Sequence, residues 1–222
     1  GLRALIDKSG ISEAPSAFHL GYVLGPRINA CGRVGEASLG NKLLCSRDDF
    51  QAGQLADKLN EFNAQRKEIE AYVLLSAIEM LEGTPQEYPI AFAAGKDWHQ
   101  GVVGIVAGKL KERYNVPAFV MSIEPDEVKG SARSVPGVDL GALIIAAKEK
   151  GLLTKGGGHT MAAGFSLPED KIDSEAEKLY EAEHPAPETA ESPTEPTQPD
   201  EPKAEPQPAA EVTASEQPPV VK

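Results

Sequence analysis

The chain has 222 residues, of which 41% are hydrophobic and 5% aromatic, and its formal net charge is −12 at pH 7. This length is enough for one substantial domain, or two small ones, with a buried core. We expect no membrane-spanning helix, because no run of about 18 apolar residues occurs, and therefore no membrane as a partner.

The first residues, Gly1 to Leu5, lack both an initiator Met and the apolar stretch of a signal peptide. We therefore expect a segment of a longer, cytoplasmic protein. The two cysteines, Cys31 and Cys45, form neither a CxxC motif nor another metal-ligand spacing. Reduced thiols are the expectation for a protein in that compartment.

The N-terminal part predicts a loop followed by a long helix. Residues 18–34 alternate short apolar pieces with Gly, Pro and Asn, which indicates a structured loop. From Asp48 to Glu82 the apolar residues recur at helical spacing, and Gly53 is the one helix-breaking residue. Asp48 and Asp49 stand where N-caps are favoured, and Gly83-Thr84-Pro85 ends the pattern. We expect one helix, broken at most once.

The following segment alternates between strand and helix patterns, which predicts a compact α/β module. Residues 154–159 are expected to form a loop, and 160–163 to begin a helix. Apolar runs predict strands at 88–94, 118–121, 129–134 and 164–167, and periodicity predicts helices at 102–114 and 139–150.

The C-terminal tail, 181–222, is rich in Pro, Glu, Ala, Thr and Gln, with almost no large apolar side chain. Such a segment cannot bury enough surface to offset its chain entropy, so we expect disorder. It contains ten acidic residues and two lysines, so residues 1–180 carry only −4 of the net charge of −12. A nearly neutral body can still present a local basic groove to a nucleic acid.

Gly25 to Arg33 is the first of three glycine-flanked polar clusters. Arg27, Asn29 and Arg33 lie on a stretch that Pro26 constrains and two glycines loosen. Guanidinium groups match phosphate oxygens, and small neighbours let a backbone approach closely. The alternative is an ordinary loop whose arginines pair with acidic residues such as Glu36.

The second cluster is Gly130 to Ser134. On a strand, Ser131 and Arg133 project from the same face because side chains alternate with a period of two. A hydroxyl beside a guanidinium forms a small anion pocket suited to a terminal phosphate. A solvated polar strand face is the alternative interpretation.

The third cluster is Gly156-Gly157-Gly158-His159. Three consecutive glycines let backbone amides turn toward an anion, and the helix expected after them would add a favourable potential. His159 can then donate to a phosphate, although a tight turn with a capping histidine is an alternative. Before an apolar helix, His99 can line a cleft or form a polar helix start. Trp98 can stack on a base, but packing is the simpler interpretation.

The body contains no Asp-x-Asp and no His pair, and His19, His99 and His159 are isolated. Metal-dependent nucleases hold their ions with clustered Asp and His residues. We therefore expect no residue of this chain to bind a metal ion.

In this order and spacing the clusters resemble the RecJ family of the DHH phosphoesterase superfamily. The resemblance covers roughly residues 1–170 and rests on four motifs: LGPRINACGR (24–33), WHQGVVGIVAGKL (98–110), GSARS (130–134) and GGGHTMAAGFSL (156–167). It implies an α/β fold with the rim of a DHH catalytic domain over 1–45, a connecting helix over 46–84 and a DHH-associated domain over 85–170.

The resemblance also implies a function, namely 5′-to-3′ degradation of single-stranded DNA in recombination and repair. Two Mn²⁺ or Mg²⁺ ions would bind an upstream DHH domain, so this chain alone is expected to be inactive. A single-strand-binding protein or a helicase would be a further partner. The motif positions assign the 5′-phosphate to Ser131 and Arg133, another phosphate contact to Arg27 or Arg33, and the scissile region to Gly157, Gly158 and the catalytic candidate His159.

This chain departs from the family pattern where the acidic tail replaces an oligonucleotide-binding fold, and where Cys31 occupies a position expected for alanine. Two alternatives remain. One is an oligoribonucleotide or cyclic-dinucleotide phosphodiesterase of the same superfamily. The other is a non-catalytic nucleic-acid-binding module related to the C-terminal domain of alanyl-tRNA synthetases.

Overall fold

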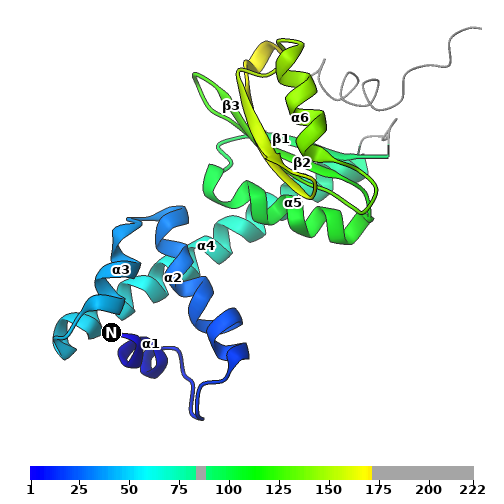
Figure 1. Ribbon diagram of the computed structural model, residues 1–222. Helices are drawn as coiled ribbons and strands as arrows, with labels where there is room; N and C mark the ends of the chain where they lie inside the picture. Colours follow the sequence, from blue (N-terminus) through cyan, green and yellow to red (C-terminus); the bar gives the residue numbers. More distant parts are fainter. Residues whose placement is uncertain (84–88, 172–222) are drawn as a thin grey trace, which may run out of the picture. The chain divides into compact units, whose positions relative to one another are not determined.

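The computed structural model describes residues 1–83 and 89–171. In Figure 1 the blue and cyan N-terminal part is helical, and the green and yellow part contains the sheet. The tail predicted to be disordered, 181–222, and the predicted helix stop at Thr84-Pro85 lie outside the described residues.

Short helices form the N-terminal part and share one apolar core. Residues such as Leu5, Leu24, Leu43 and Leu59 are fully or almost fully buried there. The elements are α1 (Leu2–Lys8), a π-helical segment η1 (His19–Leu24), α2 (Gly25–Val34), α3 (Ser38–Cys45) and the first half of α4 (Asp49–Gly83).

The loop predicted over 18–34 is wrong, because η1 and α2 occupy most of this range. Pro26 stands in the first turn of α2, where a missing N–H breaks no helical hydrogen bond. Gly25 is needed because a Cβ there would lie 2.9 Å from the backbone oxygen of Leu20. Glycine and proline, which suggested a loop, here allow one helical segment to follow another.

Helix α4 is continuous over 35 residues. Its start is capped as predicted, since the backbone N–H of Gln51 donates to Asp48 Oδ1 at 2.6 Å. Its first half packs against α1, α2 and α3, and later residues such as Val73 and Ala77 pack in the core beside the sheet. No helix in the described part of the chain is long and apolar enough to cross a membrane.

The α/β part contains a five-stranded sheet of order β1-β2-β3-β5-β4, in which only β1 and β2 are parallel. Thus the predicted α/β fold class is confirmed. The strands are β1 (Ala91–Lys96), β2 (Ala118–Ile123), β3 (Val128–Arg133), β4 (Lys155–His159) and β5 (Ala162–Leu167), and the helices are α5 (Gln100–Tyr114), α6 (Leu140–Glu149) and the 3₁₀ turn η2 (Glu169–Lys171).

The two helices of this part cover opposite faces of the sheet (Figure 1). Along β2, Val120 belongs to the core that contains α5, whereas Phe119 and Met121 belong to the core that contains α6. Helix α5 contacts β1, β2 and β3, whereas α6 contacts β4 and β5. The α5 side of the sheet is therefore least covered over β5 and β4.

The loop predicted at 154–159 and the helix start predicted at 160–163 are wrong, because both segments belong to the β4–β5 hairpin. A Cβ on Gly156 would lie 2.7 Å from Ile144 Cγ2, and one on Gly158 would lie 2.5 Å from the backbone oxygen of Ala162. Glycine within a strand often marks a close approach of this kind. Packing therefore requires glycine at 156 and 158, and none of the three glycines has a positive φ.

Candidate functional site

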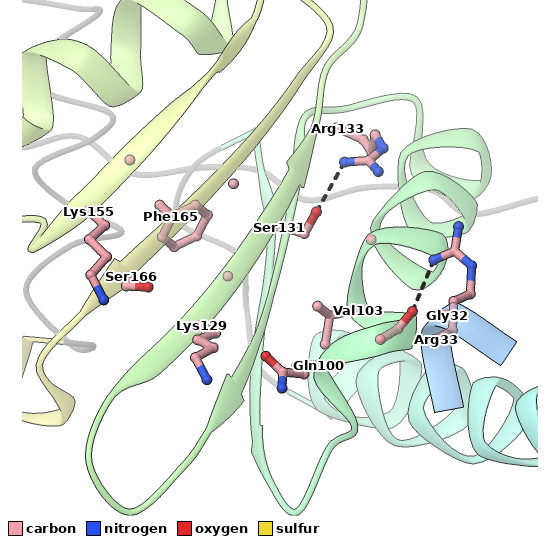
Figure 2. Close-up of a pocket in the computed structure, with 15 residues that line it drawn as sticks. Gly32, Arg33, Gln100, Val103, Lys129, Ser131, Arg133, Lys155, Phe165 and Ser166 are labelled. Carbon is pink, nitrogen blue, oxygen red and sulfur yellow. Dashed lines mark hydrogen bonds between the residues drawn. The ribbon is translucent and has the colours of Figure 1, made fainter. Parts of the chain in front are cut away.

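A cavity of about 550 Å³ lies where the end of α2, the start of α5 and the open part of the sheet meet (Figure 2). Its wall combines cationic and hydroxyl side chains with several glycines. The lining residues are Gly32, Arg33, Gln100, Gly101, Val103, Gly104, Lys129, Gly130, Ser131, Arg133, Lys155, Gly156, Gly164, Phe165 and Ser166.

Strand register arranges the polar residues of the sheet in rows. Residues directly opposite each other on paired strands point to the same face. One row across β3, β5 and β4 is Lys129, Ser166 and Lys155, the next is Ser131, Gly164 and Gly157, and the third is Arg133, Ala162 and His159. The middle row has glycine at two of its three positions. This face is therefore a shallow trough between two rows of larger side chains.

Ser131 and Arg133 lie on the same face of β3, as strand alternation predicted. Arg133 Nη1 donates to Ser131 Oγ at 3.1 Å and to the backbone oxygen of Ala132 at 2.8 Å. On the facing helix α5, a Cβ at Gly104 would lie 3.0 Å from both Arg133 Nη2 and Ser131 Oγ. The absence of a side chain at Gly104 leaves room for the guanidinium.

Arg33 brings a second positive charge to this end of the cavity. It comes from the last turn of α2, and its Nη1 donates to the backbone oxygen of Gly101 at 3.0 Å (Figure 2). Burial, and after it the charge of Arg33, lowers the pKa of Arg133 from its ordinary value. Within residues 1–83 and 89–171 no carboxylate forms an ion pair with either arginine. This end of the cavity therefore has a charge imbalance that an anion would relieve.

The two lysines at the other end are already paired with carboxylates. Lys129 Nζ lies 2.7 Å from Glu124 Oε2, and this hydrogen bond is the main cause that raises the pKa of Lys129. Lys155 Nζ lies 3.2 Å from Glu127 Oε1. The lysine end is charge-balanced, so the arginine end attracts an anion more strongly.

The structure separates Arg27 from Arg33. Arg27 is half-buried, and its Nε and Nη1 donate to Asn60 Oδ1 of α4 at 2.6 Å and to the backbone oxygen of Val23 in η1 at 2.7 Å. Burial lowers its pKa. It does not line the cavity, whereas Arg33 does. The alternative pairing of these arginines with Glu36 is not observed, because Glu36 bonds Ser38 and Lys42 instead.

Asn29 lines a smaller cavity that shares Arg33 with the first. Gly157, Gly158 and His159 are exposed on β4, and they do not line the first cavity. His159 is two strands away from Arg133 in the same row, roughly 10 Å at the usual strand spacing. The predicted site residues thus divide into a central group and a peripheral group.

Trp98 and His99 have structural contacts. Trp98 is only 4% exposed, and its ring covers Gly95, where a Cβ would lie 2.2 Å from a ring atom. His99 caps α5, since its Nδ1 accepts from the backbone N–H of Gly101 at 3.0 Å. The packing and capping interpretations account for both residues.

Several cavity residues were not predicted. Lys129 precedes Ser131 and Arg133 at the same period of two, so strand alternation could have identified it. By contrast, Gly164 and Lys155 reach the cavity through the register of β3, β5 and β4, which no local pattern indicates.

The described residues do not fit a metal centre. They contain no group of three or more His, Cys, Asp or Glu side chains placed to hold an ion. Cys31 is buried and donates through Sγ to the backbone oxygen of Ile28 at 2.9 Å, Cys45 is exposed, and neither forms a disulfide.

Comparison with known proteins identifies relatives over most of the chain. The DHHA1 domain model matches residues 87–183. The single-stranded-DNA-specific exonuclease RecJ of Dickeya dadantii is 41% identical over 181 residues, which are 78% of this chain and 31% of that protein. The Escherichia coli RecJ is 38% identical over 180 residues, with the same coverage of 78% and 31%.

A solved structure shows the same fold. RecJ from Thermus thermophilus in complex with Mn²⁺ superposes with a TM-score of 0.73 and 29% identity, over 84% of this chain and 27% of that one. Its complex with Mg²⁺ superposes with a TM-score of 0.72. The chain spans about a third of the length of these curated relatives, namely 31% of the Dickeya dadantii and of the Escherichia coli protein.

Proposed function

Because the chain belongs to the RecJ family, as a portion that carries the DHHA1 domain, we propose that it holds the substrate of a 5′-to-3′ single-stranded-DNA exonuclease. Both relatives are named as single-stranded-DNA-specific exonucleases. Recombination and repair are the processes in which such an enzyme would act.

One observation carries the proposal: Arg33 and Arg133 line the same cavity as the Ser131 hydroxyl, and neither guanidinium has a carboxylate partner in the described chain. A terminal 5′-phosphate is a dianion or nearly so, and it offers three oxygens to these donors. The hydroxyl donates to one oxygen and the guanidiniums neutralise the charge. A 5′-hydroxyl end offers neither feature, so this group distinguishes the two kinds of DNA end.

The trough gives the rest of the strand a path. Gly164 and Gly157 leave space beside Ser131, since a Cβ on Gly157 would meet no atom within 4 Å. A sugar–phosphate backbone can approach the sheet closely at such positions. We assign His159, with Gly157 and Gly158, to the scissile region at the edge of the sheet, and Arg27 to the support of α2.

The metal ions of the reaction would bind elsewhere in the whole protein. The Thermus thermophilus relative was solved with Mn²⁺ and with Mg²⁺, whereas the described residues form no cluster that fits such an ion. We propose that an upstream DHH domain supplies the ions, and that this chain positions the strand for attack there. A single-strand-binding protein or a helicase remains a predicted partner.

The test uses 5′-phosphorylated single-stranded DNA with Mn²⁺, first with this chain alone and then with a separately produced DHH domain of a relative. We expect no digestion by the chain alone and digestion after mixing. The Arg133→Gln variant should give no digestion after mixing. Digestion by the chain alone would show that it contains a metal site, and the assignment of roles would then be wrong.

A further inference from the structure

A second cavity of about 190 Å³ adjoins the first, between α2, α4 and α5. It is lined by Pro26, Asn29, Arg33, Arg66 and Ile105. Arg33 belongs to both cavities, so a ligand that leaves the first cavity past Arg33 reaches the second. The function proposed above uses no other residue of this lining.

Arg66 is a buried cation with unused hydrogen-bond donors. Its side chain is 12% exposed, Nη1 donates to Glu70 Oε2, and Nη2 donates to Asn63 Oδ1 at 3.0 Å. A guanidinium has five N–H donors, so three have no acceptor among the described residues. One of these is Nε, the only buried side-chain nitrogen or oxygen in the described chain without a partner. A buried donor without a partner is unusual, and a bound ligand is one explanation.

The charges around this cavity do not cancel. Glu70 is shared by two cations, because Lys109 Nζ lies 2.5 Å from its other oxygen. Arg66, Lys109 and Glu70 together therefore carry one positive charge, and Arg33 adds a second. No carboxylate lines the cavity. Its potential is positive, and Asn29 adds an amide donor at its wall.

We propose that this cavity is a second phosphate subsite, which holds an internal phosphodiester of the single strand whose 5′-phosphate lies at Ser131 and Arg133. The inference rests on the proposed function and adds a contact for Asn29 and Arg66. A phosphodiester carries one negative charge, which matches the single net positive charge of Arg66, Lys109 and Glu70 when Arg33 faces the terminal phosphate. Pro26 and Ile105 provide apolar contact for the attached sugar.

Ile105 offers a matched pair of variants that leaves the buried Arg66 in place. Ile105 is partly exposed at the cavity wall. Ile105→Glu places a carboxylate beside Arg66, which occupies its donors and repels phosphate. Ile105→Gln has the same size and no charge. Asn29→Ala, at an exposed position, removes the amide without changing any charge.

Two probes separate the subsites. Thymidine 5′-monophosphate can occupy only the first, and a 5′-phosphorylated dT12 can occupy both. We expect Ile105→Glu to weaken dT12 binding about tenfold, the scale of one charge-assisted hydrogen bond, and to leave the mononucleotide affinity within about twofold. For dT12, Ile105→Glu should reduce the magnitude of the negative slope of log K against log salt by about 0.7, because one phosphate contact is lost. Ile105→Gln should reproduce the wild-type slope, and Asn29→Ala should weaken dT12 selectively.

The results that would overturn the second subsite differ from those that would overturn the proposed function. If Arg133→Gln weakens both probes while Ile105→Glu changes neither, or changes both equally, the second subsite is wrong and the proposed function stands. If the wild-type chain binds neither probe, or Arg133→Gln changes neither affinity, both proposals are overturned.

Discussion

Arg133 donates a hydrogen bond of 3.1 Å to the hydroxyl of Ser131, two positions earlier on β3. Gly104 on α5 leaves room for both groups, and both line the cavity. A phosphate bound there would meet donors that are already positioned, which reduces the entropy lost on binding.

Replacement of this guanidinium should therefore remove the preference for a 5′-phosphate. We expect Arg133→Gln to weaken binding of 5′-phosphorylated single-stranded DNA by about tenfold or more, since a hydrogen-bonded charge is lost. Binding of the 5′-hydroxyl strand should change much less. Fluorescence anisotropy with the two labelled strands measures both affinities.

Arg3→Gln is the matched control, because Arg3 is an exposed arginine that pairs with Asp7 and does not line either cavity. An equal loss for both strands in Arg133→Gln would contradict a role in recognition of the strand end.

The glycines of β4 should respond differently to the same substitution. A Cβ on Gly158 would lie 2.5–2.6 Å from backbone atoms of Ala162 and Ala163, whereas one on Gly157 would meet no atom within 4 Å. We expect Gly158→Ala to lower the free energy of unfolding by about 1–3 kcal/mol, the usual cost of overpacking. Gly157→Ala should leave stability equal or slightly higher, because alanine restricts the unfolded chain.

Thermal unfolding of the two variants measures this contrast. At Gly157 a larger residue such as Val should preserve the melting temperature and weaken single-stranded DNA binding, because it fills the trough. Unchanged binding by Gly157→Val would place the strand elsewhere.

Trp98 should report on packing and not on bound DNA. It is the single tryptophan of the chain, and its ring is buried against Gly95. We expect its fluorescence to remain unquenched when saturating single-stranded DNA is added, and Trp98→Ala to destabilise the fold by about 3–5 kcal/mol. Strong quenching would restore the base-stacking interpretation.

Replacement of Glu70 should lower the stability of the fold and raise its affinity for single-stranded DNA. Its carboxylate is buried between Arg66 and Lys109. Glu70→Gln leaves these cations without a counter-charge, which we expect to cost roughly 3 kcal/mol in chemical unfolding. The same change makes the second cavity more positive, so a folded sample should bind dT12 more tightly.

Glu68→Gln, at an exposed position of the same helix, controls for a general change in net charge. Weaker binding by Glu70→Gln, at a temperature where it is fully folded, would argue against phosphate in this cavity.

Local patterns determined much of the fold. The N-caps Asp48 and Asp139 and the periods that follow them predicted α4 and α6, because capping and periodicity involve residues a few positions apart. Strand alternation likewise placed Ser131 and Arg133 on one face. The segments that were wrong, 18–34 and 154–163, are rich in glycine or proline, whose local preferences were overridden by helix and strand packing.

By itself the sequence determined the α/β class, the motifs of the family and the pairing of Ser131 with Arg133. Only the tertiary structure decided that Arg33, and not Arg27, joins them. That choice depends on α2 meeting α5 where Gly101 lacks a side chain, since a Cβ there would lie 2.2 Å from the backbone oxygen of Arg33. The register of β3, β5 and β4 similarly decided which glycines form the trough. Contacts between residues far apart in the chain follow from packing of whole elements, which no local period encodes.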